Sequence, residues 1–93
     1  MHELIKQFGK PFASELVGIL MINKGKLEMD RWRSFLLKHG LIKKTTKIIR
    51  ANVFYRGMCN EWYVRLRNGR GNYIIYIVVT DNDMKQIRME LSE

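Results

Sequence analysis

The spacing of hydrophobic residues changes at Gly40, and this change limits the possible folds more than any other feature of the chain. Before Gly40, apolar residues recur three and four positions apart, as they do on one face of a helix. After Gly40 they alternate with polar residues, which is typical of strands with one buried face. A chain with helices first and strands afterwards is expected to adopt an α+β fold.

Glycine and proline divide the first forty residues into three expected helices. Gly9 separates the first helix from the second, and Pro11 suits the first turn of the second because its missing N–H has no partner there. Gly25 suits the left-handed cap that ends the second helix, and Gly40 ends the third. The expected helices span residues 2–8, 11–22 and 28–39.

Turn residues divide the remaining chain into four expected strands. Segments 57–60 and 81–83 are typical of turns, and Asn68-Gly69 favours a two-residue type I′ turn. The almost continuous apolar run 72–80 suits a central strand buried on both faces. The helices are expected to pack on a four-stranded antiparallel meander with strands at 47–56, 61–67, 72–80 and 85–91.

The length and cysteine content predict one domain in a reducing compartment. Ninety-three residues provide for one hydrophobic core, so we expect a single domain over residues 1–93. The lone Cys59 has no internal disulfide partner. No signal segment opens the chain, and no apolar run approaches the roughly 20 residues of a membrane span. We therefore expect a soluble, cytoplasmic protein without a membrane partner.

Positive charge is concentrated in the middle of the chain. The formal net charge is +8, and residues 21–70 hold thirteen basic residues against three acidic ones. A surface charged only for solubility would scatter these residues. The concentration predicts a basic patch and makes nucleic acid the first partner to test.

The expected hairpin places arginines close together. With a turn at Asn68-Gly69, Arg67 lies opposite Arg70, and Arg65 lies opposite Asn72. Directly opposed like charges destabilise a sheet unless an anion neutralises them, so this tip is expected to contact phosphates. The expected core side of the hairpin consists of Trp62, Val64, Leu66, Tyr73, Ile75, Ile77 and Val79.

The strand before the hairpin extends the predicted basic surface. One side of it carries Arg50, Phe54 and Arg56; if that side joins the hairpin arginines, aromatic rings lie among cations, as in proteins that bind single strands. The alternative is that Phe54 and Tyr63 pack under a helix and the arginines fringe a solvated edge. The candidate nucleic-acid-binding residues are Arg65, Arg67, Arg70, Arg50, Arg56, Lys43, Lys44, Lys47, Tyr63 and Phe54.

A winged helix-turn-helix is a second mode of binding. Its helix pair would be 11–22 and 28–39, with the hairpin as the wing and with Arg31, Arg33, Ser34 and Lys38 facing outward. Glu28 and Asp30 would then lie where the recognition helix meets DNA, which disfavours this mode.

The residue types give little support for catalysis or for a bound metal. His2 is expected at a frayed terminus and His39 at a helix end, neither with an orienting carboxylate nearby in the sequence. There is no Cys/His cluster for zinc and no glycine-rich phosphate loop, and segment 81–83 favours a turn over a chelating site. We expect no enzyme activity, no cofactor and no metal.

One stretch leaves a catalytic alternative open. EWYVRLRNGRGNYIIYIVVTDND, residues 61–83, resembles the late strands of ribosome-dependent RNA-cutting toxins of the RelE superfamily, which are small basic proteins with helices before an arginine-bearing meander. The resemblance implies a metal-independent ribonuclease in which Arg65 and Arg67 stabilise phosphorane charge and Tyr76 assists proton transfer.

The sequence thus predicts a small basic nucleic-acid-binding protein without catalysis, acting in regulation of transcription, RNA or a mobile element. It leaves open DNA or RNA and single or double strand. A protein-binding effector, such as a phage or plasmid inhibitor of a host nucleic-acid enzyme, is the alternative, because six methionines and two tryptophans suit a docking surface. The broad apolar surface of helix 11–22 also suits a homodimer.

Overall fold

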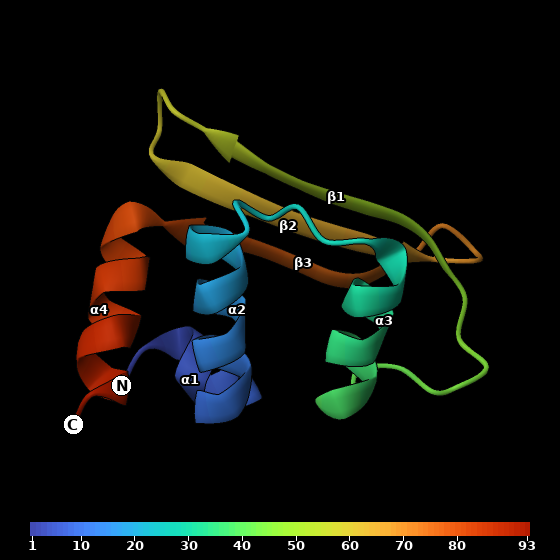
Figure 1. Ribbon diagram of the computed structural model, residues 1–93, viewed down its shortest axis with the longest axis horizontal. Helices are drawn as coiled ribbons and strands as arrows, with labels where there is room; N and C mark the ends of the chain where they lie inside the picture. Colours follow the sequence, from blue (N-terminus) through green and yellow to red (C-terminus); the bar gives the residue numbers. More distant parts are fainter.

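The computed structural model describes residues 1–93 as helices packed on one face of an antiparallel sheet. The elements are α1 (Glu3–Phe8), α2 (Lys10–Ile22), α3 (Met29–Lys38), β1 (Ile48–Arg56), β2 (Glu61–Asn68), β3 (Tyr73–Thr80) and α4 (Asp81–Leu91). The strands form one sheet in the order β1-β2-β3. Figure 1 shows all four helices on the same side of this sheet. The predicted α+β class, with N-terminal helices before an antiparallel meander, is confirmed.

The last element is a helix, so the predicted strand 85–91 is wrong and the sheet has three strands instead of four. Thr80 and Asp83 form a capping box: the Thr80 hydroxyl accepts a hydrogen bond from the Asp83 N–H (2.9 Å), and the Asp83 carboxylate accepts one from the Thr80 N–H (2.9 Å). This box starts a helix where a turn was expected. The buried residues of α4 are Met84 and Ile87, which lie three positions apart, and α4 packs against α2.

The expectation that the apolar run 72–80 forms a central strand is also wrong. β2 is the central strand and β3 lies at an edge. Along β3, Ile75 and Ile77 are buried, whereas Tyr76 and Val78 between them are exposed. The alternation arises because the helices cover only one face of the sheet (Figure 1).

The β2–β3 turn differs from the expected two-residue turn and changes the register. The Asn68 N–H donates to the Asn72 carbonyl (2.8 Å), the Gly71 N–H donates to the Asn68 carbonyl (3.0 Å), and Gly71 has φ +85°. A three-residue loop that ends in a left-handed glycine has this pattern. Arg67 consequently lies opposite Tyr73, so its predicted pairing with Arg70 is wrong.

The register also decides which predicted core residues are buried. A shift between Leu66 and Arg67 turns Tyr73 away from the helices, in contrast to the prediction. Of the other residues predicted for the core side, Trp62 is partly buried and packs against the core, and the rest are buried: Val64, Leu66, Ile75, Ile77 and Val79.

The core is one cluster of 18 buried residues between the helices and the sheet. The second helix contributes the largest share, with Phe12, Ala13, Leu16, Val17, Ile19 and Leu20. Phe12 stacks on Phe35 of α3 with ring centroids 5.0 Å apart. The apolar surface of α2 is therefore used within the chain, and of its large apolar side chains only Met21 and Ile22 at its end remain exposed.

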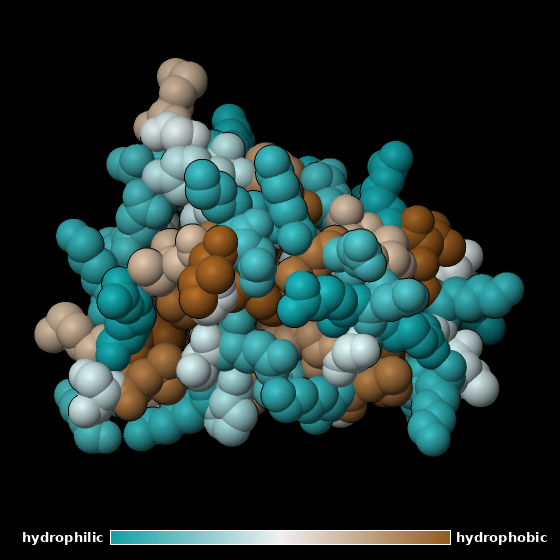
Figure 2. All heavy atoms as spheres, in the orientation of Figure 1, coloured by the Kyte–Doolittle hydropathy of each residue, from teal (hydrophilic) through white to brown (hydrophobic).

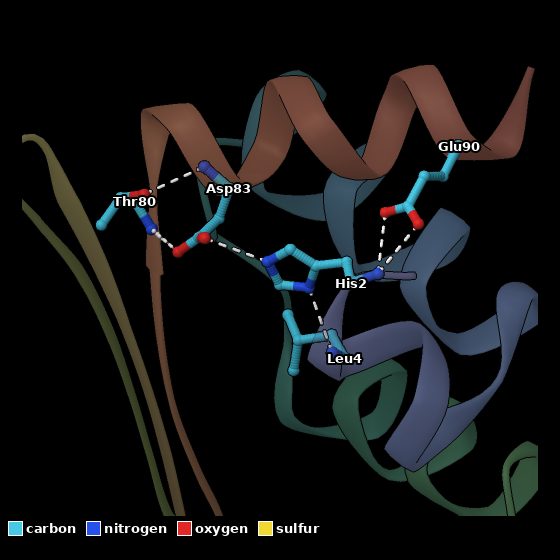
Figure 3. Close-up of polar contacts among 5 residues, drawn as sticks. All are labelled: His2, Leu4, Thr80, Asp83 and Glu90. Atoms are coloured by element: carbon cyan, nitrogen blue, oxygen red, sulfur yellow. Dashed lines mark hydrogen bonds and ion pairs between the residues drawn. The ribbon is translucent and has the colours of Figure 1, made fainter.

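The N-terminus is attached to α4 and is not frayed as the sequence suggested (Figure 3). His2 caps α1, since its Nδ1 accepts a hydrogen bond from the Leu4 N–H (3.1 Å). The other ring nitrogen of His2 lies 2.9 Å from the Asp83 carboxylate, and the His2 N–H donates to Glu90 (2.9 Å). These contacts join the two ends of the chain.

The predicted helix ends are otherwise confirmed. Pro11 lies in the first turn of α2, and Gly9, Gly25 and Gly40 all have positive φ at helix ends. His39 caps the end of α3 and lies 2.7 Å from the Glu15 carboxylate of α2. All four helices fall short of the length and hydropathy that a membrane crossing requires.

Candidate nucleic-acid interface

The sheet face without helices collects most of the arginines that the sequence analysis selected. β1 pairs with β2 so that Ala51 and Val53 lie opposite the core residues Leu66 and Val64, which directs the residues between them to the other face. We call this second face the arginine face. It carries Arg50, Asn52, Phe54, Arg56, Tyr63, Arg65, Arg67, Tyr73 and Tyr76. Phe54 and Tyr63 therefore do not pack under a helix, so this part of the alternative interpretation is wrong.

Phe54 and Tyr63 form the centre of an alternating array of rings and cations. Their rings are nearly parallel, with an interplanar angle of 2° and centroids 5.1 Å apart. The Arg65 guanidinium lies 4.9 Å from the Phe54 centroid, and that of Arg56 lies 5.7 Å from Tyr63. Each ring thus contacts both the other ring and an arginine, and both residues are half-buried.

The open rings of the arginine face belong to Tyr73 and Tyr76, which are 41% and 49% exposed. Their centroids lie 4.9 Å apart in an edge-on arrangement. Reasoning from the sequence placed Tyr73 in the core and named Tyr76 only through the toxin resemblance. The signal for Tyr73 was the glycine pair around Arg70, which permits the longer turn and the altered register.

Three arginines surround a small hollow on this face. Arg50, Asn52, Arg65, Arg67 and Tyr73 line a volume of about 170 Å³. The Nε of Arg65 is buried and has no hydrogen-bond partner. Arg50 lies directly opposite Arg67, so a like-charge pair does occur in the sheet, but on the other side of β2 from the one predicted. A hollow lined by several arginines is suited to an anion such as a phosphate.

None of these arginines is neutralised by a carboxylate. The ion pairs of the structure are Met1–Glu90, His2–Asp83, Lys38–Glu15 and His39–Glu15. All four join the helices or the N-terminus. The three strands contain one acidic residue, Glu61, opposite Arg56 at one end of the sheet. The arginine face therefore has a net positive charge, and Figure 2 shows hydrophilic side chains projecting on the sheet side of the molecule.

The remaining predicted basic residues lie at one end of the sheet. Arg70 is exposed in the β2–β3 turn, and Lys43, Lys44 and Lys47 are exposed in the loop before β1 at the same end of the molecule (Figure 1). A Cβ at Gly69 of the turn would lie 3.5 Å from the Lys47 Cβ. Arg33 holds this loop by donating hydrogen bonds to the carbonyls of Lys44 and Thr46, so its guanidinium is not directed outward as the winged-helix alternative requires.

The residues considered for catalysis and metal binding are distributed as follows. Arg65, Arg67 and Tyr76 share the arginine face, with the Arg65 guanidinium 5.9 Å from the Tyr76 centroid. Asp81 accepts a hydrogen bond from the Tyr55 hydroxyl (2.7 Å), and this contact raises the pKa of Tyr55. Asp83 is engaged by Thr80 and His2. No three His, Cys, Asp or Glu side chains are grouped for a metal.

Comparison with known proteins gives no family. No protein-family model matches the chain, and neither the curated proteins nor the solved structures include a significant match.

Proposed function

We propose that the arginine face binds single-stranded nucleic acid without cutting it, in a regulatory role. The observation that supports this most directly is the hollow on the arginine face, whose lining includes Arg50, Arg65 and Arg67, three arginines without carboxylate partners. Phosphate contacts of this kind supply affinity that does not depend on base sequence.

The open tyrosines favour single strands over a duplex. Tyr73 and Tyr76 lie beside the hollow, so a strand with one phosphate there has bases within reach of both rings. Stacking on a side chain requires an unpaired base, which a duplex does not offer. The face is also a sheet surface that carries no helix to enter a major groove (Figure 1). Arg70 and the loop lysines extend the basic track beyond one end of the face.

The test is fluorescence anisotropy with labelled single-stranded RNA, single-stranded DNA and duplex DNA at about 50 and about 200 mM salt. We expect at least one of the two single strands to bind more tightly than the duplex, and we expect its affinity to fall steeply as the salt concentration rises. The same samples on a denaturing gel should show intact strands. If neither single-stranded RNA nor single-stranded DNA binds, the proposal is contradicted. Binding that does not respond to salt favours a protein-docking role.

A matched pair of variants separates the arginine face from general charge. Arg65→Gln with Arg67→Gln removes two charges from the face, whereas Arg31→Gln with Arg88→Gln removes two exposed charges from α3 and α4. We expect the first pair to lower the slope of log affinity against log salt by about 1.4, from about 0.7 per phosphate contact, and the second pair to change it little. Equal losses would assign binding to diffuse charge.

RNA cleavage is the second candidate, favoured by the shared position of Arg65, Arg67 and Tyr76 on one face. Arginines there would stabilise phosphorane charge, and the tyrosine would transfer a proton. Incubation with translating ribosomes tests it: cleavage of the bound message that is lost with Tyr76→Phe supports this candidate, and an intact message excludes it.

A further inference from the structure

A second hollow lies on the helix side of the sheet, separate from the hollow on the arginine face. It has a volume of about 630 Å³ and lies between the end of α2, the α2–α3 loop, the first two strands and the start of α4. Figure 2 shows hydrophobic residues reaching the surface between the start of α4 and the end of α2. Tyr55, Trp62 and Met84 are among its apolar lining residues, and its charged lining residues are Lys24, Lys26 and Asp81. The volume is within the range of small-molecule sites, and the lining is mostly apolar, as such sites require.

Two aromatic rings form one wall of this hollow. Tyr55 and Trp62 lie opposite each other on β1 and β2, with ring centroids 5.1 Å apart. The Tyr55 ring is fixed at its far end because its hydroxyl donates to the Asp81 carboxylate (2.7 Å) and lies 3.2 Å from the Asn60 side-chain oxygen. Fixed rings provide apolar contact area at low entropic cost and bind flat or chain-like apolar groups.

Two lysines of the lining, Lys24 and Lys26, lie in the α2–α3 loop, and this loop is held against the sheet. Gly25 has φ +71°, and a Cβ there would lie 2.6 Å from the Val53 Cγ1 and 3.2 Å from Trp62. The loop backbone therefore rests directly on the sheet at this glycine. Lys24, itself at φ +52°, and Lys26 flank it. The contact of Gly25 with the sheet maintains the positive φ of Lys24 and fixes the backbone positions of both lysines.

The charged residues that line the hollow have a net positive charge. Neither lysine takes part in an ion pair. The one carboxylate of the lining, Asp81, accepts the Tyr55 hydroxyl hydrogen bond. An apolar hollow whose lining includes two lysines without ion-pair partners fits a ligand that is apolar at one end and anionic at the other.

We propose that this hollow is a binding site for a small aromatic or aliphatic carboxylate. The apolar part lies against Tyr55, Trp62 and Met84, and the carboxylate faces Lys24 and Lys26. The site shares Phe54 with the arginine face but none of its arginines, so the proposal does not depend on nucleic-acid binding.

Three probes of the same shape test the charge requirement: naphthalene-2-carboxylate, its neutral alcohol analogue naphthalen-2-ylmethanol, and the cationic 2-naphthylmethylammonium. Binding is measured by calorimetry, and the site is mapped by amide chemical shifts in the full chain. We expect the carboxylate to bind about fivefold more tightly than the alcohol, as two partly solvated ion pairs allow, and the ammonium to bind most weakly. The shifts should centre on Gly25 and Trp62.

Two double variants provide the comparison. Lys24→Asn with Lys26→Gln should abolish the preference for the carboxylate while the alcohol binds as before; asparagine is chosen because it tolerates the left-handed backbone. Lys10→Gln with Lys85→Gln removes equal charge from exposed positions elsewhere and should leave the preference intact. Equal affinity for all three probes in the unmodified protein, or a preference that survives in the first variant, overturns the proposal. Loss of carboxylate binding in Arg65→Gln with Arg67→Gln also overturns it, by placing the probe on the arginine face.

Discussion

The guanidinium carbon of Arg67 lies 4.1 Å from the centre of the Tyr73 ring, and Nη2 of the same side chain donates a hydrogen bond to the Tyr73 hydroxyl (2.7 Å). Arg67 also donates to the Gly71 carbonyl (2.7 Å) and faces Arg50 across the sheet. These contacts with Tyr73 stabilise the Arg67 guanidinium next to the like charge of Arg50, because a cation–π contact at an exposed site contributes about 0.5–1 kcal/mol. Tyr73 therefore both positions Arg67 and offers a ring to a base.

Substitution of Tyr73 separates its two roles. Tyr73→Phe keeps the ring and removes the hydroxyl that accepts from Arg67, whereas Tyr73→Ala removes both. We expect single-strand affinity to fall by about 1–3 kcal/mol in the alanine variant, the usual value of one stacked base, and to fall much less in the phenylalanine variant. Anisotropy with a single-stranded oligonucleotide measures both. Equal losses in the two variants would assign the effect to the hydroxyl and would contradict stacking.

The alternation of residues and the positive charge sufficed to predict most of the arginine face. The placement of Arg65, Arg67 and Tyr63 on one side of β2 follows from the period of two within a strand. The partner strand was harder to place, because both asparagine and glycine occur twice between Arg67 and Tyr73 and allow turns of different length. The register depends on which turn forms, so the position of Tyr73 required the structure.

The error at the C-terminus has a similar origin. In segment 85–91, Ile87, Met89 and Leu91 alternate with polar residues, which favours a strand, but Met84 and Ile87 also share a helical face. In so short a segment the two periods cannot be told apart, and the end signals decide. Here the Thr80-to-Asp83 spacing of a capping box indicated the helix. The contacts of His2 with α4 join the two ends of the sequence, which no local pattern reveals.

The capping box of α4 makes a specific contribution to stability. Thr80→Ala removes the hydroxyl that accepts from the Asp83 N–H, and we expect the free energy of unfolding to fall by about 1 kcal/mol. Thr80→Ser keeps a hydroxyl at this position and should recover most of that loss. Urea denaturation followed by tryptophan fluorescence measures the three proteins. A serine variant as unstable as the alanine variant would mean that the threonine methyl group, and not the cap, carries the effect.

Two glycines should respond to alanine in opposite directions. Gly25→Ala places a Cβ 2.6 Å from the Val53 Cγ1 at a positive φ, so we expect a loss of about 1–3 kcal/mol in the free energy of unfolding. Gly18 lies inside α2, and no atom would come within 4 Å of an added Cβ. Gly18→Ala should therefore stabilise the protein by about 0.5–1 kcal/mol. Thermal and urea unfolding of both variants check the signs, and a neutral Gly25→Ala would show that the loop does not rest on the sheet.

Acid should destabilise the fold through two carboxylates. Burial opposes ionisation of Glu15, but hydrogen bonds from His39 and Lys38 outweigh it and lower the pKa below the ordinary 4.5. Burial likewise opposes ionisation of Asp83, but bonds from His2 and Thr80 lower its pKa below 3.8. With depressed pKa values in the folded state, the unfolded chain takes up protons first as the pH falls. The free energy of unfolding should thus hold above about pH 5 and decrease as the pH falls through 4.5 and 3.8 toward the folded-state values.

Urea titrations across this range should give a flatter profile for Glu15→Gln with Asp83→Asn than for Asp30→Asn with Glu93→Gln at exposed positions. Parallel profiles for the two double variants would show that other groups govern acid unfolding.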